Sequence, residues 1–311
     1  MCVRGIATSK YINLYTDFAF KKIFGTEANK DILISFLNTF LEFEGDKEIE
    51  DIEYINPEQL GDTIRERRAI YDVYCTTKEG ERFIVEMQRA KQDYFKDRAL
   101  YYSSFAIREQ GQKGGDKPWD YHLMPVYVIG ILDFRIDDDP ARADKVITRV
   151  RLKDDDNRTF SDRLQLVFLE MPKFRKREDE LESFSDKWLF VIKNLYQLDD
   201  KPKGLTEGIF KKLFKEASVA NLQSPEKEEY EESLKIYRDW YNVIDTAKNE
   251  GLAEGRAEGR AEGLAEGEAK GRAEGAKQQA IETARNAKTL GLPVETIAQL
   301  TGLSAEEIKN L

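Results

Sequence analysis

The sequence predicts an α/β fold with a mixed central sheet flanked by helices and with a helical C-terminal extension. Three observations lead to this prediction. A region with helical spacing of apolar residues comes first, and two short strand-like runs joined by a tight turn follow it. A second helical region then precedes a continuous apolar run, residues 125–132. That order of helix, strands, helix and buried strand is typical of an α/β protein with a mixed sheet.

Composition sets broad limits on the protein. The chain has 311 residues, with 41% hydrophobic and 11% aromatic content, enough for one large domain or two smaller ones with an appendage. No apolar run approaches the roughly 20 residues of a membrane helix, and the N-terminus lacks the apolar stretch of a signal peptide. Cys2 and Cys75 are the only cysteines, which excludes a disulfide framework and a cysteine zinc site. We expect a soluble, cytoplasmic protein that does not enter a membrane.

The net charge of −10 disfavours nonspecific, high-affinity binding to nucleic acid. Phosphate contacts need clustered Lys and Arg, and a strongly acidic balance repels polyanions at long range. Two local basic patches, residues 65–68 and 173–177, nevertheless remain candidates for such contacts.

The first elements are expected over residues 10–41 and 49–56. Residues 10–41 have helical spacing; Thr16 or Asp17 can cap a first segment that ends at Gly25, and a second apolar segment follows it. Residues 49–56 predict a strand.

The chain after the two paired runs is expected to alternate between helix and strand. Residues 91–110 predict a helix, and residues 125–132 a fully buried central strand. Two further strands are expected over residues 146–152 and 164–170. Residues 180–245 are charged and helix-rich, with one apolar face formed by Trp188, Leu189, Ile192 and Leu195.

A low-complexity segment lies at residues 251–275, where glycine recurs every four residues, mostly as Gly-x-Ala-Glu. Ala, Glu and Arg favour helix, but each interior Gly costs about 1 kcal/mol relative to Ala. Four residues turn an ideal helix by about 400°, so the glycines wind around the axis instead of forming one seam. The segment is either a marginal helical spacer or a supercoiled arm through which a homo-oligomer forms.

The end of the chain, residues 279–311, predicts three short helices. They are separated by Gly291-Leu292-Pro293 and by residues 301–304, and Ser304 begins a capping box. The expected small core is Leu290, Ile297, Ala298, Leu300, Leu303, Ile308 and Leu311. A helical cap or oligomerisation element and a helix-turn-helix DNA reader are the alternatives, although the candidate recognition segment is poor in basic residues. The predicted domains are therefore a core domain over 1–245 with a helical subregion at 180–245, a repeat segment over 246–280 and a helical element over 281–311.

Two acidic residues in apolar, strand-like runs are the most informative feature of the chain. Asp72 lies in residues 69–75 and Glu86 in residues 83–88. If Lys78-Glu79-Gly80 forms a three-residue loop with Gly80 in the left-handed conformation, Asp72 lies directly opposite Glu86. Their Cβ atoms are then roughly 5 Å apart, and like charges so placed are destabilising unless something offsets them. A divalent cation such as Mg²⁺ is the usual offset.

The alternation of side chains along the two strands places Asp72, Glu86 and Gln88 on one face. Alternatively, these polar residues have no catalytic role and form the solvent face of a half-buried sheet, although Ile70, Tyr74 and Ile84 share that face. The opposite face is almost wholly apolar and should meet the core; it consists of Tyr71, Val73, Cys75, Phe83, Val85 and Met87.

An Asp in one strand, a short turn and Glu-x-Gln in the next resemble the PD-(D/E)XK nuclease signature. More closely, the chain resembles the Rpn group of recombination-promoting nucleases and transposases. The matching pieces are residues 16–25, 71–75 and 84–88, Arg98 with Tyr102, the strand 128–132, the repeat and the small helical end. The resemblance covers residues 10–135 well and the tail loosely, and it implies a restriction-endonuclease-like core.

The resemblance implies a function for these residues. Asp72 and Glu86 would hold Mg²⁺, or another divalent cation such as Mn²⁺, with help from the backbone carbonyl of Met87. The ion would activate a water and stabilise charge on the scissile phosphate of DNA. Gln88 stands where many such nucleases have Lys, and a neutral amide supplies neither positive charge nor a titratable base. Either the metal carries more of the activation, or a cation such as Lys91 substitutes.

Two further roles have local alternatives. Asp17 matches an acidic residue of the first helix that can reach the metal in related enzymes, but Asp17 and Lys21 also have the i, i+4 spacing of a helix ion pair. Lys91 and Arg98 are seven residues apart on the next predicted helix and are candidates for phosphate contacts, although such residues are commonly solvated.

Other chemistries find little support in the sequence. The single histidine gives little basis for Ser-His-Asp catalysis, and no glycine loop of a nucleotide-binding motif follows a strand. We therefore expect a metal-dependent DNA endonuclease linked by the resemblance to DNA recombination or mobile elements. The alternative is a catalytically weak nuclease-like DNA-binding or oligomeric interaction protein.

Overall fold

A computed structural model describes residues 9–56, 58–59, 69–91, 94–111 and 121–311. The chain divides into two compact units, Met1–Arg238 and Asp239–Leu311. None of the helices in the described ranges is long and apolar enough to cross a membrane.

The first unit contains a mixed six-stranded sheet in the order β1-β4-β5-β6-β8-β7. The central pairs β5–β6 and β6–β8 are parallel, whereas the flanking pairs β1–β4, β4–β5 and β7–β8 are antiparallel. This confirms the predicted α/β fold with a mixed sheet. The strands are β1 (Glu53–Tyr54), β4 (Val73–Thr76), β5 (Arg82–Gln88), β6 (Val126–Leu132), β7 (Ile147–Lys153) and β8 (Thr159–Glu170), with β2 (Glu58–Gln59) and β3 (Ala69–Ile70) pairing separately.

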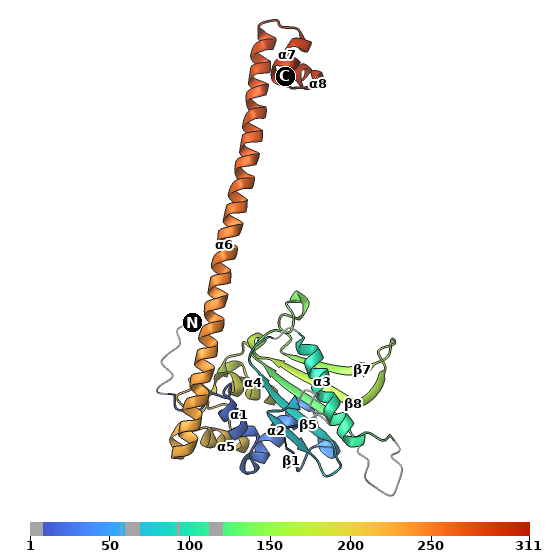
Figure 1. Ribbon diagram of the computed structural model, residues 1–311, viewed down its shortest axis with the longest axis vertical. Coiled ribbons are helices and arrows are strands. Elements are labelled where there is room, and N and C mark those ends of the chain that lie inside the picture. The colour runs from blue at the N-terminus through green and yellow to red at the C-terminus, as the bar shows by residue number, and fades with distance from the viewer. Residues whose placement is uncertain (1–8, 57, 60–68, 92–93, 112–120) are drawn as a thin grey trace. The chain divides into compact units, whose positions relative to one another are not determined.

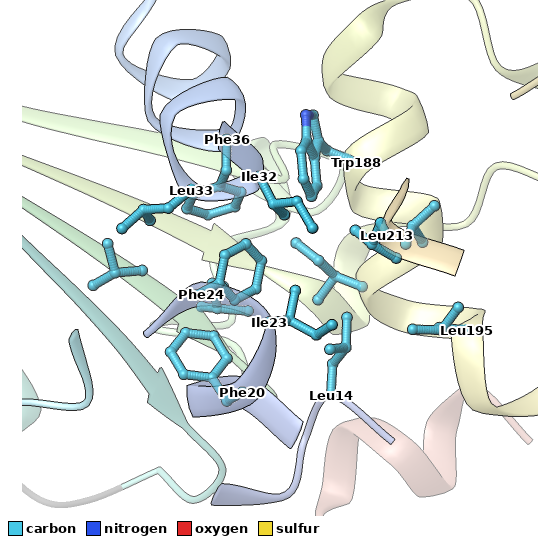
Figure 2. Close-up of a cluster of buried hydrophobic side chains, with 14 of the residues drawn as sticks. Leu14, Phe20, Ile23, Phe24, Ile32, Leu33, Phe36, Trp188, Leu195 and Leu213 are labelled. Atoms are coloured by element: carbon cyan, nitrogen blue, oxygen red, sulfur yellow. The ribbon is translucent and has the colours of Figure 1, made fainter. Parts of the chain in front are cut away.

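Helices cover both faces of the sheet (Figure 1). One face packs against four helices and the first turns of α6 (Ser224–Thr289) in the larger apolar core, and the other packs against α3 in a smaller one. Figure 2 shows part of the larger core, where Phe24 and Phe36 surround the buried Trp188. The helices on the first face are α1 (Asp17–Phe24), α2 (Lys30–Leu41), α4 (Phe184–Asn194) and α5 (Gly208–Glu216), and α3 is Phe95–Arg108.

Helix α1 begins and ends where local sequence chemistry predicts. The Thr16 side chain accepts a hydrogen bond from the backbone N–H of Ala19, and Gly25 ends the helix. The prediction of helix from residue 10 is wrong for residues 10–16. Tyr11 forms an antiparallel bridge with Ser218, the N–H of Ile12 donates to the carbonyl of Ala217 at 2.8 Å, and a turn closed by the N–H of Thr16 and the carbonyl of Asn13 leads into the helix. The segment leading to the site is thereby tied to the core.

The β4–β5 hairpin has the predicted register. Val73 pairs with Val85 and Thr76 with Arg82, and the N–H of Thr77 donates to the carbonyl of Glu81 at 3.1 Å. Gly80 has a φ of +92°, the left-handed conformation that the three-residue loop requires.

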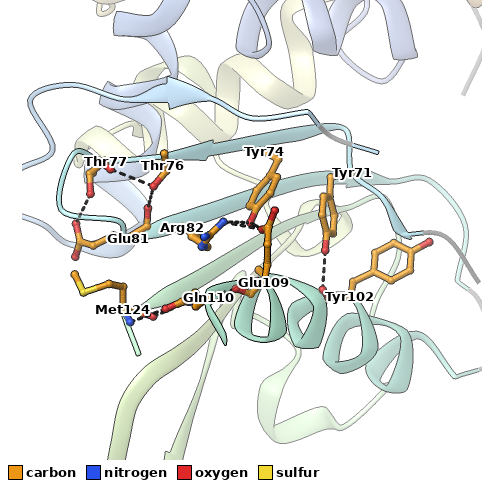
Figure 3. Close-up of polar contacts among 11 residues, drawn as sticks. Tyr71, Tyr74, Thr76, Thr77, Glu81, Arg82, Tyr102, Glu109, Gln110 and Met124 are labelled. Atoms are coloured by element: carbon orange, nitrogen blue, oxygen red, sulfur yellow. Dashed lines mark hydrogen bonds and ion pairs between the residues drawn. The ribbon is translucent and has the colours of Figure 1, made fainter. Parts of the chain in front are cut away.

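The predicted position of Tyr71 on the face of Val73 is wrong. The strand is interrupted at Tyr71 and Asp72, between β3 and β4. Tyr71 instead packs beside Tyr74 in the core under α3, with ring centroids 5.1 Å apart, and its hydroxyl donates to the carbonyl of Tyr102 at 2.8 Å (Figure 3). Side chains alternate between the two faces only along a continuous strand, so the alternation does not extend across this interruption.

Helix α3 is fastened to the hairpin by polar contacts at its C-terminal end (Figure 3). Arg82 Nη1 donates to a Glu109 carboxylate oxygen and to the Tyr74 hydroxyl, both at 2.7 Å, and the Tyr74 hydroxyl donates to Glu109 at 2.6 Å. Gln110 bonds both the N–H and the carbonyl of Met124. These bonds hold the helix that carries Arg98 over the strand that carries Glu86.

Two predicted strands have different limits in the structure. The strand expected at residues 49–56 is reduced to the two residues of β1. β8 begins at Thr159, five residues earlier than expected, because it continues as a hairpin with β7 beyond the rest of the sheet.

Helix α6 (Ser224–Thr289) begins in the first unit and packs against α1 there. The Tyr230 hydroxyl accepts from the N–H of Asn13 at 3.0 Å, and the Ser233 hydroxyl accepts from the N–H of Phe18 at 3.2 Å. Lys22 and Glu226 form an ion pair of 2.6 Å. The first turns of α6 are thus part of the core that positions α1.

The second unit consists of the rest of α6, α7 (Val294–Thr301) and α8 (Ala305–Lys309). The Gly-x-Ala-Glu segment is helical throughout, and a Cβ added to any of its glycines would meet nothing within 4 Å. The predicted first short helix of the terminal element is therefore the end of α6. Within the described part of the chain, an added Cβ at the repeat glycines would therefore meet open space.

The small core of the second unit differs from the predicted set. Leu290 and Leu300 are 80% and 65% exposed, so their assignment to the core is wrong. Alanines of α6 take their place, because α7 packs against that helix face. The buried members are Ala284, Ala287, Ile297, Leu303 and Ile308. Ser304 forms the predicted capping box with Glu307.

Candidate active site

Asp72 is tied directly to the neighbouring strand β5. Its Oδ2 accepts a hydrogen bond of 2.7 Å from the backbone N–H of Met87. The β4–β5 ladder ends at Val73, so the Met87 N–H lies beyond the last strand pair and the Asp72 side chain takes the place of a backbone acceptor. The N–H and C=O of a residue in a strand point to the same side, so the Met87 carbonyl also faces Asp72.

Glu86 lies opposite Asp72 when the observed register is continued by one residue. Its Oε1 is buried and has no hydrogen-bond partner among the residues that the structure describes. Burial, and then the charge of Asp72, raise the pKa of Glu86 to about 8, while Arg98 and the backbone N–H of Asp72 oppose that shift. A metal-free Glu86 is thus largely protonated at neutral pH.

The environment of Asp72 includes charges from α1 and from the end of β5. Burial raises the pKa of Asp72, and the hydrogen bond from Met87 opposes this effect. Among the charges, Asp17 raises this pKa further, whereas Lys21 and Arg89 lower it. The α1 residues therefore act electrostatically on the same carboxylate that the hairpin presents.

Asp17 is the first residue of α1 and also forms the local ion pair expected from its spacing. Its Oδ2 lies 3.0 Å from Lys21 Nζ, and both side chains are about half exposed. Across the described ranges, no three His, Cys, Asp or Glu side chains gather closely enough to hold a metal ion. Asp17 therefore does not complete a three-carboxylate cluster with Asp72 and Glu86.

Gln88 and Arg98 line one small pocket with Glu86, on the side of the sheet that α3 covers. Gln88 Nε2 donates to the carbonyl of Ala90 at 3.2 Å. The Arg98 guanidinium lies 4.8 Å from the centroid of the Tyr102 ring and opposes the raised pKa of Glu86. Lys91, the other predicted phosphate contact, is exposed. The pocket thus brings together Glu86, Gln88 and Arg98.

Arg89 is a basic residue that the sequence reasoning missed. It follows β5, and strand alternation places it with Met87 and on the opposite side from Gln88. Its guanidinium lies 6.0 Å from the centroid of the Tyr237 ring, and its charge acts on Asp72. The alternation from Met87 could have indicated its side of the sheet, but no sequence pattern connects it to Tyr237.

Asp133 is a second residue that the sequence reasoning missed. It follows β6, and its N–H donates to the carbonyl of Gln88 at 3.0 Å, so it lies at the same end of the parallel strands. Burial raises its pKa to about 6, and Lys193 opposes the shift. An acidic residue directly after a buried apolar strand was the available signal.

Of the two predicted basic patches, only the one at residues 173–177 lies within the described residues. Residues 65–68 lie outside the described residues. In the patch at 173–177, Lys173 is buried and pairs with Glu170 at 2.8 Å, so it is unavailable for phosphate.

The residues at the hairpin fit a divalent cation. Glu86 Oε1 is a buried carboxyl oxygen without a hydrogen-bond partner among the described residues, and Asp72 has one oxygen that the Met87 bond does not use. Carboxylate and carbonyl oxygens are the ligands that Mg²⁺ prefers. Asp72, Glu86 and the Met87 carbonyl would hold such an ion.

Comparison with protein families agrees with the fold. The model of the PD-(D/E)XK nuclease family transposases matches residues 14–247, about three quarters of the chain, so the chain belongs to this family. The matched range includes α1, the hairpin and the start of α6. Comparison with curated proteins and with solved structures gives no match.

Proposed function

We propose that this protein is a metal-dependent DNA endonuclease that hydrolyses phosphodiester bonds at a site built on Asp72 and Glu86. Membership of a nuclease family of transposases makes DNA the substrate that we propose, and DNA recombination or mobile-element activity the process. The observation that carries the proposal is the buried Glu86 Oε1 without a hydrogen-bond partner, opposite Asp72.

The two acids form an unfavourable arrangement without a cation. Two carboxylates opposite one another on a partly buried hairpin repel, and burial together with the charge of Asp72 raises the pKa of Glu86 to about 8. A structural role gives no reason to retain such a pair, because a neutral side chain would relieve it. A bound Mg²⁺ or Mn²⁺ would activate water and neutralise charge on the scissile phosphate.

The chain's own residues would divide the remaining work. The Met87 N–H fixes the Asp72 carboxylate against β5. Gln88 orients the attacking water through its amide. Arg98, beside Glu86, contacts a phosphate oxygen from the α3 side. In the reaction, the water loses a proton as its oxygen bonds to phosphorus, one P–O ester bond breaks, and the leaving oxygen takes up a proton to become a hydroxyl.

A nuclease-like DNA-binding protein without strong activity is the second candidate. Gln88 favours it, because its amide cannot supply the positive charge of a lysine and its Nε2 is directed to the Ala90 carbonyl. The two candidates differ in turnover and share DNA binding.

Nicking of supercoiled plasmid DNA with Mg²⁺ tests the proposal. The wild type is expected to nick, and Asp72→Asn and Glu86→Gln are expected to lose nicking while still binding DNA. Glu79→Gln is the matched control, because Glu79 is an exposed carboxylate on the turn at the other end of the hairpin. DNA binding without nicking by the wild type would instead establish the second candidate.

A further inference from the structure

Within the described residues, the Arg89 guanidinium forms no hydrogen bond that stabilises the fold. A guanidinium has five N–H donors. Among the described residues, Arg89 makes no side-chain hydrogen bond or ion pair; its recorded contact is with the face of the Tyr237 ring. A cation–π contact leaves those donors available to a ligand.

The aromatic surface under Arg89 is itself fixed in place. Tyr237 is only 7% exposed and stacks on Tyr15, with ring centroids 6.5 Å apart and planes inclined by 26°. Tyr15 lies two residues before Asp17, and Tyr237 lies on α6. Three distant segments of the chain thus converge to hold one arginine.

The position of Arg89 points to an anionic ligand at the site. It follows Gln88 directly, on the other side of the strand, and its charge reaches the Asp72 carboxylate. It therefore approaches from the side of α1, whereas Arg98 approaches Glu86 from the side of α3. A phosphate at the hairpin would lie between two guanidinium groups that come from opposite faces of the sheet.

We propose that Arg89 contacts the scissile phosphate from the Asp72 side and supplies the positive charge that Gln88 lacks, and that Tyr237 is its positioning residue. This inference rests on the proposed nuclease function. Planar guanidinium groups suit phosphate oxygens, and a preplaced cation stabilises the negative charge that develops during phosphoryl transfer.

The test compares Arg89→Ala with Arg158→Ala, using the full-length chain. Arg158 is a matched control, because it lies on the β7–β8 turn with a side chain 79% exposed. Plasmid nicking with Mg²⁺ gives kcat and KM, and fluorescence anisotropy with a DNA duplex and Ca²⁺ gives affinity. Arg89→Ala is expected to lower kcat about 100-fold, the effect of losing one preorganised donor. Its Kd for DNA should change far less, and Arg158→Ala should match the wild type.

Tyr237 is tested through substitutions that separate the ring from its hydroxyl. Tyr237→Phe keeps the aromatic face and is expected to retain nicking, whereas Tyr237→Leu removes the face and is expected to lower kcat while KM stays within about twofold. Equal losses in both variants, accompanied by equal losses of thermal stability, would overturn the positioning role.

The outcomes for the two proposals are distinguishable. Wild-type nicking with normal nicking by Arg89→Ala would overturn this inference and leave the nuclease proposal intact. A change in Kd with kcat unchanged would also overturn it, since Arg89 would then grip DNA away from the scissile bond. If the wild type binds DNA but does not nick it, the nuclease proposal fails. Arg89→Ala, which removes that phosphate contact, would then still lower the salt dependence of DNA binding by about one unit of slope, and an unchanged slope would overturn the inference.

Discussion

Oδ2 of Asp72 accepts a 2.7 Å hydrogen bond from the backbone N–H of Met87, the residue directly after Glu86. The bond joins the interrupted edge of β4 to the continuous strand β5. It fixes one aspartate oxygen without using any side chain of β5. The two carboxylates are consequently held near each other by the backbone, and this arrangement leads to the following predictions.

Metal binding should depend on two side chains and one backbone group. Asp72→Asn and Glu86→Gln are expected to weaken Mg²⁺ or Mn²⁺ binding at least tenfold, because each removes a charged oxygen ligand. Met87→Leu is expected to bind as the wild type does, since residue 87 contributes only its backbone. Isothermal titration calorimetry measures this, and unchanged affinity in both acidic variants would contradict the assigned metal site.

Stability should depend on pH through Glu86. Its pKa rises from 4.5 in the unfolded chain to about 8 in the native chain, so between these values only the native chain holds the proton. The stability contribution is complete below about pH 4.5 and is lost as the pH rises through about 8. Glu86→Gln avoids this loss and should gain about 4 kcal/mol in free energy of unfolding relative to the wild type between pH 5 and pH 9.

Urea unfolding in the presence of a chelator measures that difference. Glu79→Gln is the control, because its carboxyl is exposed on the hairpin turn and should not change the pH profile. A Glu86→Gln profile parallel to the wild type would show that the pKa of Glu86 is not raised.

A lysine at position 88 should increase activity. Gln88→Lys adds a cation beside Glu86, which lowers the pKa of Glu86 and attracts the phosphate. We expect about a tenfold higher nicking rate at pH 7, whereas Gln88→Met, of similar length and neutral, should give no gain. Equal rates for the lysine and methionine variants would show that position 88 does not face the reacting phosphate.

Asp17 should affect catalysis more than stability. Its exposed pair with Lys21 is worth at most about 0.5 kcal/mol, so Asp17→Asn and Lys21→Met should unfold at nearly the same denaturant concentration as the wild type. Because Asp17 matches an acidic residue of the first helix that can reach the metal in the nucleases that the chain resembles, Asp17→Asn is expected to lower nicking at least tenfold, and Lys21→Met much less. Equal nicking by the two variants would leave Asp17 as an ordinary helix ion-pair residue.

The repeat glycines of α6 should tolerate alanine. A Cβ at Gly259 or Gly263 meets nothing within 4 Å, and each replacement should stabilise the helix by about 1 kcal/mol. Circular dichroism of the double variant should show helix retained to higher temperature. The alternative is that the glycines form a self-association seam. In that case, sedimentation velocity would show a shift of the double variant toward smaller species.

Local chemistry explains why part of the fold was predictable. Gly80 alone accommodates the positive φ of its turn, and the turn sets the hairpin register, so the opposition of Asp72 and Glu86 follows from a short stretch of sequence. Thr16 and Gly25 mark the ends of α1 for the same reason. Family membership agrees with the resemblance of these motifs.

Packing explains why other predictions were wrong. Tyr71 changes face because the strand is interrupted beside Asp72 and the ring finds a partner in Tyr74. Leu290 and Leu300 are exposed because the small C-terminal core is filled by alanines of α6 and by residues of α7 and α8. The spacing of apolar residues describes one helix or strand by itself. It does not describe the neighbouring element on which that helix or strand packs.

By itself, the sequence determined the class of fold, the hairpin register and the opposed acids, because turns, caps and strand alternation act over a few residues. Only the tertiary structure decided which charges reach those acids. Arg98 comes from α3, and Arg89 is held by Tyr237, almost 150 residues further along the chain. Such contacts depend on how helices pack on the two faces of the sheet, and no local spacing encodes them.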